Sequence, residues 1–385
     1  MTKISARQAA FRSVLASLRE ESFISDSLEK WSKESHPTEE DYRLALEIAN
    51  GTIRRLSTLE WMAKDLSKGD PLHLKNREKA LLYTALYQSA FTDKIPLYAI
   101  IHETVEIAKK QIHPSFGKFL NQLLRRVENH TFTLPQDLSI HYSYPPYFIG
   151  KLKKIYPESY LDILEIGNEA PKTFARKRGS PPFEYELLKG KEIQEYSQKT
   201  DYYIQNPTPG HLMEHLFKER QICPKKILDL CASPGGKSLM LADLFPLAHI
   251  TANDISAHKT LTLEENFKKY KMPITITAFD GREYPLEEKF DLVVVDAPCS
   301  NTGVLGRRSE ARWRLNEKNI NELQVLQKQL VERGMQLVNE GGELWYLTCS
   351  ILPMENAGLE NGFYFLPNKM GEDGGSAFKA TRKKE

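Results

Sequence analysis

The chain has 385 residues, of which 41% are hydrophobic, so it is long enough for two or three domains with real cores and is not disordered. Lysine and arginine total 53 against 51 aspartates and glutamates, and the net charge of +2 indicates no particular partner. No apolar run approaches the roughly 18 residues of a membrane span, and the N-terminus alternates charged and apolar residues where a signal peptide would have an apolar core. We therefore expect a soluble, cytoplasmic protein without a membrane partner.

The first part of the chain, residues 4–129, has apolar residues at helical spacing. One such stripe consists of Phe116, Phe119, Leu120, Leu123, Leu124 and Val127. Thr38, followed by acidic residues up to Asp41, is typical of a helix N-cap, and Pro96 suits the first turn of a later helix. These patterns predict an all-α helical bundle, which we place at residues 1–132.

The pattern changes twice after the bundle. Residues 133–210 consist of short segments separated by prolines, which predicts a small mixed connector or RNA-binding subdomain. In residues 211–385, short apolar runs alternate with helix-compatible segments; the runs begin at Lys225, His249, Ile274, Phe290 and Gly342. This alternation is typical of βαβ units, so we expect an α/β domain with a parallel sheet covered on both faces.

The turns after the predicted strands are informative, because ligands of open α/β sheets bind beyond the carboxyl ends of the strands. The first turn runs from Asp229 to Lys237, and Gly235 and Gly236 precede a helix there. Such a turn lets the backbone approach a ligand closely at a helix N-terminus. A tight turn without a ligand is the alternative. A phosphate-binding P-loop is disfavoured, because its first glycine would stand where Cys231 is.

Acidic residues follow the next two strands. Asp254 lies 25 residues after Asp229, where a carboxylate can accept hydrogen bonds from ribose hydroxyls. Asp280 ends the third strand, within reach of an adenine. Each aspartate alone could be a turn former, but together with the glycine-rich turn they predict an adenosine site.

The four cysteines, Cys223, Cys231, Cys299 and Cys349, form no Cys-x-x-Cys pair, so we expect neither a disulfide framework nor a metal site. Cys299 and Cys349 end the fourth and fifth strands, and Asp296 stands three residues before Cys299. A lone cysteine in such a place is more often buried packing. Two cysteines at neighbouring strand ends fit a specific reaction. Carbon 5 of cytosine accepts a methyl group only after a thiolate has added to carbon 6. A base or a second thiol must then help to remove the proton on carbon 5. Positive charge that could stabilise the thiolate is present at Lys237 and in an arginine-rich turn after residue 303.

The motifs Asp229–Lys237, Asp254–Ser256, Asp280–Arg282, Asp296–Gly303 and Thr348–Ser350 together closely resemble the S-adenosylmethionine-dependent RNA cytosine-5 methyltransferases. The N-terminal stretch, including residues 119–126, resembles the NusB-type RNA-binding helical domain. The combination resembles the RsmB/Sun family of bacterial 16S ribosomal RNA methyltransferases over nearly the whole chain. The resemblance implies a multidomain protein: a NusB-like bundle, a small α/β connector and, at residues 211–385, a Rossmann-like methyltransferase domain. It also implies small-subunit ribosomal RNA as the partner, and we expect a monomer.

The resemblance also implies roles for individual residues. Cys349 would be the nucleophile on carbon 6, and Cys299 would assist release of the product. Asp296 would contact or protonate the cytosine ring, and Lys237 would lie close to the reacting base. The residues expected to hold S-adenosylmethionine are Cys231, Ala232, Ser233, Pro234, Gly235, Gly236, Lys237, Asp254, Asp280 and Asp296.

A basic segment follows the Pro-Cys motif and contains Arg307, Arg308, Arg312, Trp313 and Arg314. Guanidinium groups beside an aromatic ring predict phosphate contact and base stacking, with a solvated helix start as the alternative. Three weaker basic clusters, at residues 151–154, 176–178 and 382–384, would extend this RNA track.

The C-terminal end departs from the family, because only 36 residues follow Cys349. We expect a short helix at best, a missing edge strand, and a last strand weakened by Gly375 and Ser376. This departure supports an alternative: a NusB-like RNA-binding protein with a catalytically impaired methyltransferase domain. An amino-group methyltransferase is disfavoured, because its fourth strand typically ends in Asn/Asp-Pro-Pro-aromatic, whereas this one ends in Asp-Ala-Pro-Cys.

Overall fold

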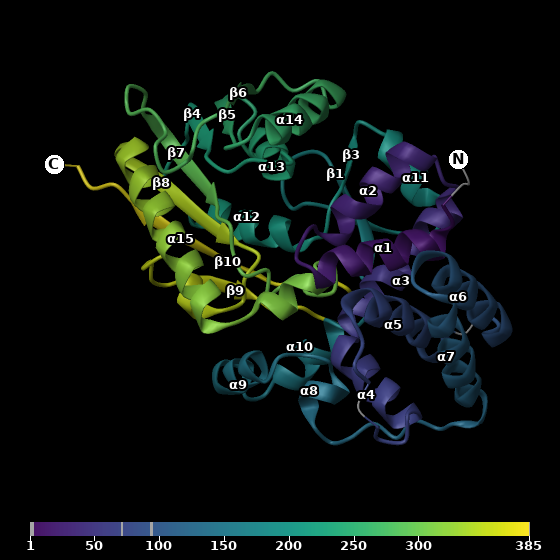
Figure 1. Cartoon of the computed structure of the whole chain (residues 1–385). Coiled ribbons are helices and arrows are strands. Elements are labelled where there is room, and N and C mark those ends of the chain that lie inside the picture. The colour runs from purple at the N-terminus through teal and green to yellow at the C-terminus, as the bar shows by residue number, and fades with distance from the viewer. Residues whose placement is uncertain (1–3, 71, 93–94, 385) are drawn as a thin grey trace. The chain divides into compact units, whose positions relative to one another are not determined.

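The computed structural model describes residues 4–70, 72–92 and 95–384, which divide into two compact units (Figure 1). Unit 1 consists of the chain up to Ala170 together with Leu305–Arg314. Unit 2 consists of Pro171–Val304 and the chain from Leu315 onward. The expected connector at residues 133–210 is thus divided at Ala170, and its existence as a separate folding domain stays a prediction.

Unit 1 is helical, as the apolar spacing predicts. Its elements are α1 (Ala6–Leu18), α2 (Ile24–Ser35), α3 (Glu39–Arg54), α4 (Leu56–Leu66), α5 (Asn76–Phe91), α6 (Leu97–Gln111), α7 (Pro114–Arg125), the 3-10 helix η1 (Arg126–Asn129), α8 (Leu138–His141), α9 (Pro146–Ile155), α10 (Tyr160–Ile166) and the 3-10 helix η2 (Ser309–Arg314). The expected cap at Thr38 is confirmed, since its side chain accepts a hydrogen bond from the backbone N–H of Asp41 at 3.1 Å. Pro96 is the N-cap residue of α6, one position before the first turn.

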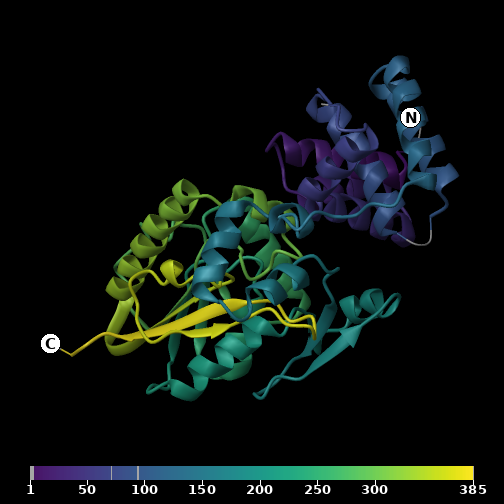
Figure 2. The same cartoon turned by 90° about the horizontal axis from the view of Figure 1, so that it is seen from below.

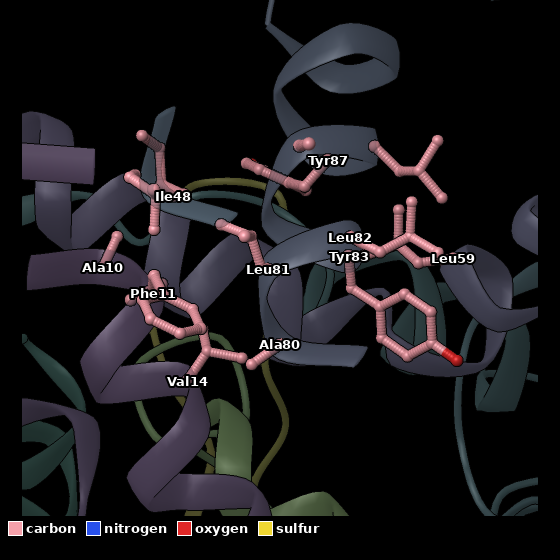
Figure 3. Close-up of a cluster of buried hydrophobic side chains, with 14 of the residues drawn as sticks. Ala10, Phe11, Val14, Ile48, Leu59, Ala80, Leu81, Leu82, Tyr83 and Tyr87 are labelled. Atoms are coloured by element: carbon pink, nitrogen blue, oxygen red, sulfur yellow. The ribbon is translucent and has the colours of Figure 1, made fainter. Parts of the chain in front are cut away.

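The core of unit 1 joins helices that are distant in sequence (Figure 3). Phe11 and Val14 of α1 lie close to Ala80 and Leu81 of α5, with Ile48 of α3 beside them. All of these side chains are essentially inaccessible to solvent. Because each large apolar side chain contributes roughly 1.5–3 kcal/mol when fully buried, this shared core stabilises the bundle.

Unit 2 begins with a small antiparallel sheet in the order β2-β1-β3. Its elements are β1 (Thr173–Lys177), β2 (Tyr185–Leu188), α11 (Glu192–Gln198) and β3 (Tyr202–Ile204). Arg176 of β1 is fully buried and forms an ion pair with Asp243, which also pairs with Arg178. The expectation that residues 176–178 extend an RNA track is therefore wrong for both arginines, because they are used inside the unit.

The larger sheet of unit 2 has the order β6-β5-β4-β7-β8-β10-β9 within the described part of the chain. Its elements are α12 (Thr208–Glu219), β4 (Lys226–Asp229), α13 (Gly236–Leu244), β5 (His249–Asn253), α14 (Ala257–Lys269), β6 (Thr275–Thr277), β7 (Phe290–Asp296), α15 (Glu317–Leu337), β8 (Val338–Thr348), the 3-10 helix η3 (Pro353–Glu355), β9 (Phe363–Phe365) and β10 (Gly375–Thr381). Strands β4 to β8 are parallel, and the strand order reverses between β4 and β7. The five predicted strands and the Rossmann-like fold are confirmed, and the reversal places a ligand crevice at the carboxyl ends of β4 and β7.

Both faces of the large sheet are covered. Apolar residues of α12 and α13 pack with one face of β4, β7 and β8, and those of α15 pack with the opposite face. This two-sided burial explains the apolar run Val293–Val295 in the centre of the sheet. Over the ranges that the structure describes, none of the helices combines the length and apolar character needed to cross a membrane.

The expectations for the C-terminal end are partly wrong. The helix after Ser350 is indeed reduced to η3, but the edge strand is present, and β10 pairs with β8 from Ser376 to Thr381. Figure 2 shows these C-terminal strands, in yellow, within the sheet. A Cβ at Gly375 would come within 2.7 Å of the Thr348 carbonyl oxygen, so glycine is required there, and its weakening of the last strand stays a prediction. Only glycine permits this close approach of β10 to the end of β8.

Candidate active site

The turn after β4 has glycine at two positions where neighbouring rings leave no room for a side chain. Gly235 has φ of 101°, and a Cβ there would lie 2.9 Å from the ring of Phe267. A Cβ on Gly236 would lie 3.0 Å from the ring of Tyr203. Glycine is therefore required at both positions for the start of α13 to pack against these rings.

Asp229 lies beneath this turn with its side chain fully buried. One carboxylate oxygen accepts a hydrogen bond from the Ser238 hydroxyl at 2.7 Å, while Oδ1 has no hydrogen-bond partner among the described residues. Burial raises the pKa of Asp229 to about 7, and the neighbouring charges of Asp296 and Asp254 add to the rise against the opposing effects of Ser238 and Lys237. Such a buried, half-satisfied carboxyl is poised for a ligand's donor group.

Exchange of Asp229 for Asn is expected to flatten the pH dependence of stability. The folded protein keeps this carboxyl protonated up to about pH 7, whereas the unfolded chain releases the proton near the ordinary value of 3.8. Folding therefore takes up a proton between these values, and the free energy of unfolding falls as pH rises through that window, by roughly 4 kcal/mol at most.

Urea unfolding of the cofactor-free protein at pH 5 and pH 8 measures this difference. Asp229→Asn should lose less stability between the two pH values than the wild type, and the exposed Asp201→Asn serves as the control. Equal losses in Asp229→Asn and the wild type would contradict the assigned burial effect.

Asp254 and Asp280, the other two predicted acids, differ in their surroundings. Asp254 is buried after β5 and accepts hydrogen bonds from the backbone N–H groups of Ser233, at 3.1 Å, and Ile255, at 2.8 Å. It thereby ties the glycine-rich turn to the end of β5. Asp280 is partly exposed, and its hydrogen bonds with Arg282 lower its pKa.

Asn253 is a residue of this region that the sequence analysis missed. Its side-chain Nδ2 donates to the backbone carbonyls of Leu230 and Phe279, and its Oδ1 accepts from the N–H of Phe279 at 2.9 Å. The buried amide thus joins the turns that follow β4 and β6. The only sequence signal was its place directly before Asp254, at the end of a predicted strand.

The remaining residues of the glycine-rich turn contribute backbone and packing. The N–H of Ala232 donates to the Asn253 carbonyl at 2.8 Å, and the carbonyl of Pro234 accepts from Asn266 at 2.7 Å. Cys231 is largely buried, and burial raises the pKa of its thiol far above the ordinary value. This thiol is therefore unsuited to act as a thiolate near neutral pH.

Lys237 and Asp296 form an ion pair where the strand order reverses between β4 and β7, with Lys237 Nζ 2.5 Å from Asp296 Oδ2. Burial favours the neutral amine, but the Asp296 carboxylate outweighs it and keeps the pKa of Lys237 above its ordinary value. The lysine is therefore a stable cation, and it also interacts electrostatically with Cys349.

Cys299 and Cys349 face each other with their sulfurs 3.0 Å apart. The hydrogen bond with Cys349, followed by burial, raises the pKa of Cys299 well above its ordinary value. Asn301, in a left-handed conformation with φ of 59°, accepts from Cys349 Sγ at 3.3 Å and donates to the Cys299 carbonyl. Two thiols from different strand ends, one of them held protonated, are thus brought together with the Lys237–Asp296 ion pair.

The two cysteine-bearing loops also interlock through their backbones. The N–H of Gly303 donates to the Cys349 carbonyl at 2.9 Å, and the N–H of Gly374 donates to the Gly303 carbonyl at 2.7 Å. A Cβ on Gly303 would lie 2.3 Å from the carbonyl oxygen of Gly374. The short C-terminal segment is therefore part of the scaffold of the site.

The expectation that the basic segment after residue 303 contacts RNA is wrong for its central residues. Arg312 is fully buried in unit 1 and donates to the backbone carbonyls of Arg54, at 2.7 Å, and Gly167, at 2.8 Å. Trp313 Nε1 donates to the Ile53 carbonyl at 2.9 Å. Arg314 lies over the ring of Phe23. The guanidinium and indole groups here donate to backbone carbonyls at helix ends. The spacing of these residues in the sequence could not show whether they would bind such carbonyls or RNA phosphates.

Residues 220–365 match the family described as 16S rRNA methyltransferase RsmB/F, and residues 4–129 match the NusB family. The ribosomal RNA small subunit methyltransferase B of Proteus mirabilis is 30% identical over 352 residues, which cover 83% of this chain and 82% of that protein. The protein of the same name from Yersinia enterocolitica is 30% identical over 350 residues, which cover 83% of this chain and 81% of that protein. The crystal structure of PH0851 shares the fold, with a TM-score of 0.76, 20% identity, and coverage of 97% of this chain and 98% of that one.

Proposed function

Because this chain belongs to the RsmB/F methyltransferase family with a NusB-type N-terminal region, we propose that it forms 5-methylcytosine in small-subunit ribosomal RNA. The resemblance that the motifs indicated is confirmed at the level of the family. The proposed formation of 5-methylcytosine rests on the pair of thiols, 3.0 Å apart, at the strand ends beside the glycine-rich turn.

The cofactor is S-adenosylmethionine, which supplies an electrophilic methyl group on a sulfonium sulfur. The residues present fit it. Gly235 and Gly236 stand at the N-terminus of α13, the buried Asp254 can accept from ribose hydroxyls, and Asp229 has an unpartnered buried oxygen among the described residues. Residues 231–234 would line the same turn, with Asp280 toward the adenine.

The thiol pair divides the work of the reaction. Cys349 adds to carbon 6 of cytosine as a thiolate, which Lys237 stabilises by its positive charge and Cys299 by donating its S–H. The new carbon–sulfur bond pushes the electron pair of the ring double bond toward carbon 5. The ring gains negative charge at its nitrogen 3, and a proton from the Lys237 ammonium reaches nitrogen 3 through Asp296, which accepts the ammonium's hydrogen bond.

Cys299 completes the reaction after carbon 5 has been methylated. The hydrogen bond with Cys349 is the largest cause of the raised pKa of Cys299. This cause is lost once the sulfur of Cys349 is bonded to carbon 6. Cys299 can then lose its proton and act as the base that removes the proton on carbon 5. The electron pair of the broken carbon–hydrogen bond forms the ring double bond, the Cys349 thiolate leaves carbon 6, and nitrogen 3 returns its proton through Asp296 to Lys237.

Asp254 gives a test of the cofactor site that does not depend on RNA. Asp254→Asn should weaken S-adenosylmethionine binding by about 10- to 100-fold, since hydrogen bonds to a charged group are worth roughly 1.5–3 kcal/mol. Isothermal titration calorimetry measures this, with the exposed Glu264→Gln on α14 as the control. Unchanged affinity in a folded Asp254→Asn protein would remove Asp254 from the cofactor site.

Incubation of the protein with methyl-labelled cofactor and unmodified small-subunit RNA tests the function itself. We expect label in 5-methylcytosine; a folded, cofactor-binding protein that leaves all cytosines unmethylated would contradict it. The alternative, a NusB-like RNA-binding protein with an impaired methyltransferase domain, predicts RNA binding without cofactor binding. We further propose that the protein acts as a monomer in the cytoplasm, where ribosomal subunits are assembled.

A further inference from the structure

Glu355 is a buried carboxylate that the proposed chemistry does not use. It ends η3, and only 1% of the residue is exposed. Acidic side chains are almost never fully buried unless they are paired. No cation lies within ion-pair distance of Glu355 in the part of the chain that the structure describes, and its partners are neutral donors. Hydrogen bonds alone thus offset the cost of burying this charge.

The donors to Glu355 come from the two loops that carry the cysteines. Its Oε1 accepts from the N–H of Ser300 and from Gln327 Nε2, both at 2.9 Å. Its Oε2 accepts from the hydroxyls of Ser300 and Ser350. Since Ser300 directly follows Cys299 and Ser350 directly follows Cys349, one carboxylate joins the residues next to both thiols.

Further hydrogen bonds close this cluster. Thr302 Oγ1 lies 2.9 Å from Ser350 Oγ and accepts from the N–H of Ile351 at 3.1 Å. Gln327 of α15 also donates to the carbonyl of Pro298 at 2.9 Å. The loop after β7, the loop after β8 and helix α15 are therefore held by one fully buried network.

The charge of Glu355 also acts on the thiols. It adds to the effects of Cys349 and burial that raise the pKa of Cys299. Among the described residues, the titratable groups around the thiol pair are Glu355, the Lys237–Asp296 ion pair and Tyr346, whose hydroxyl donates to the backbone carbonyl of Glu355 at 2.9 Å. Removal of the negative charge is therefore expected to ease ionisation of Cys299.

We propose that Glu355 is a positioning residue for methyl transfer, which holds the two cysteine-bearing loops in register through Ser300 and Ser350. This inference rests on the proposed function, because the register matters for catalysis only if both thiols act on one cytosine. Because its side chain is buried among protein donors, Glu355 acts through the two loops. Its effect is to keep the sulfurs at 3.0 Å and to favour the neutral form of Cys299.

Two variants separate the geometry from the charge. Glu355→Gln keeps an acceptor for the Ser300 N–H and places an amide opposite the two hydroxyls, so it removes mainly the charge. Glu355→Ala removes the bridge itself. The exposed Glu360→Gln, in the same segment, is the matched control.

The first readout needs neither RNA nor cofactor. Iodoacetamide labelling across a pH series, read on the tryptic peptide 290–307 that contains Cys299 alone, gives the apparent pKa of that thiol. Glu355→Gln should lower it by about one unit, and Glu360→Gln should leave it unchanged. A folded Glu355→Gln protein with the wild-type profile would overturn the assigned effect of the charge.

The second readout is single-turnover methyl transfer. Glu355→Ala should slow it about 100-fold while cofactor affinity stays unchanged, and Glu355→Gln should restore most of the rate. Parallel loss of melting temperature and cofactor affinity in both variants would overturn the proposal in favour of a purely structural role. If the wild type methylates no RNA, the proposed function fails, and the labelling profiles still decide whether Glu355 controls the thiol pair.

Discussion

Exchange of Cys349 for Ala is expected to abolish methyl transfer, with a loss of at least about four orders of magnitude in rate. Carbon 5 of cytosine is not nucleophilic unless a thiolate has added to carbon 6, and alanine cannot form that bond. Single-turnover transfer of labelled methyl groups to small-subunit RNA measures the loss. Cofactor affinity should remain, because Cys349 lies in the loop after β8 and the turn after β4 is unchanged.

The exposed Cys223→Ala provides the control for Cys349→Ala, since it removes a thiol that lies far from both cysteine-bearing loops in sequence. It should transfer methyl groups at the wild-type rate. Appreciable transfer by Cys349→Ala would show that another group attacks the pyrimidine, and the assigned nucleophile would be wrong.

Exchange of Cys299 for Ala is expected to stop turnover at a different stage. The first bond to carbon 6 can still form, but the base that removes the proton on carbon 5 is missing, so protein and methylated RNA should remain covalently joined. Denaturing gel electrophoresis should show a stable protein–RNA species in a yield approaching one per protein. The species should require cofactor and should disappear when Cys349 is also replaced.

The pKa of Cys299 supports the proposal that this residue is not the nucleophile. Its hydrogen bond with Cys349 and its burial both favour the neutral thiol. If Cys299→Ala released product freely, or if Cys349→Ala accumulated the adduct instead, the two assigned roles would have to be revised.

The large sheet was predictable because each parallel strand is a short apolar run that ends in a polar turn. The alternation from Lys225 onward identified β4 to β8, and the acids and cysteines at their ends indicated one shared edge. The pairing of Cys299 with Cys349 follows from that geometry, since the two residues follow the adjacent strands β7 and β8.

The sequence was insufficient where a residue type serves two purposes. Gly375 weakens an ordinary strand, yet here it permits the close approach of β10 to Thr348. Arg312 has the chemistry of a phosphate contact, yet it donates to backbone carbonyls inside unit 1. The role of Glu355 could not be predicted from the sequence, because its partners lie 5, 28 and 55 residues away along the chain.

The most direct test of the account is to identify the cysteine that is bonded to RNA. Each of the four cysteines falls in its own tryptic peptide, and Cys349 is the only cysteine in residues 334–369. After reaction of Cys299→Ala with cofactor and small-subunit RNA, nuclease and trypsin digestion followed by mass spectrometry should show a methylated cytidine nucleotide on peptide 334–369. A nucleotide on any other peptide, or an unmodified peptide 334–369 from a sample in which the covalent species is present, would contradict the account.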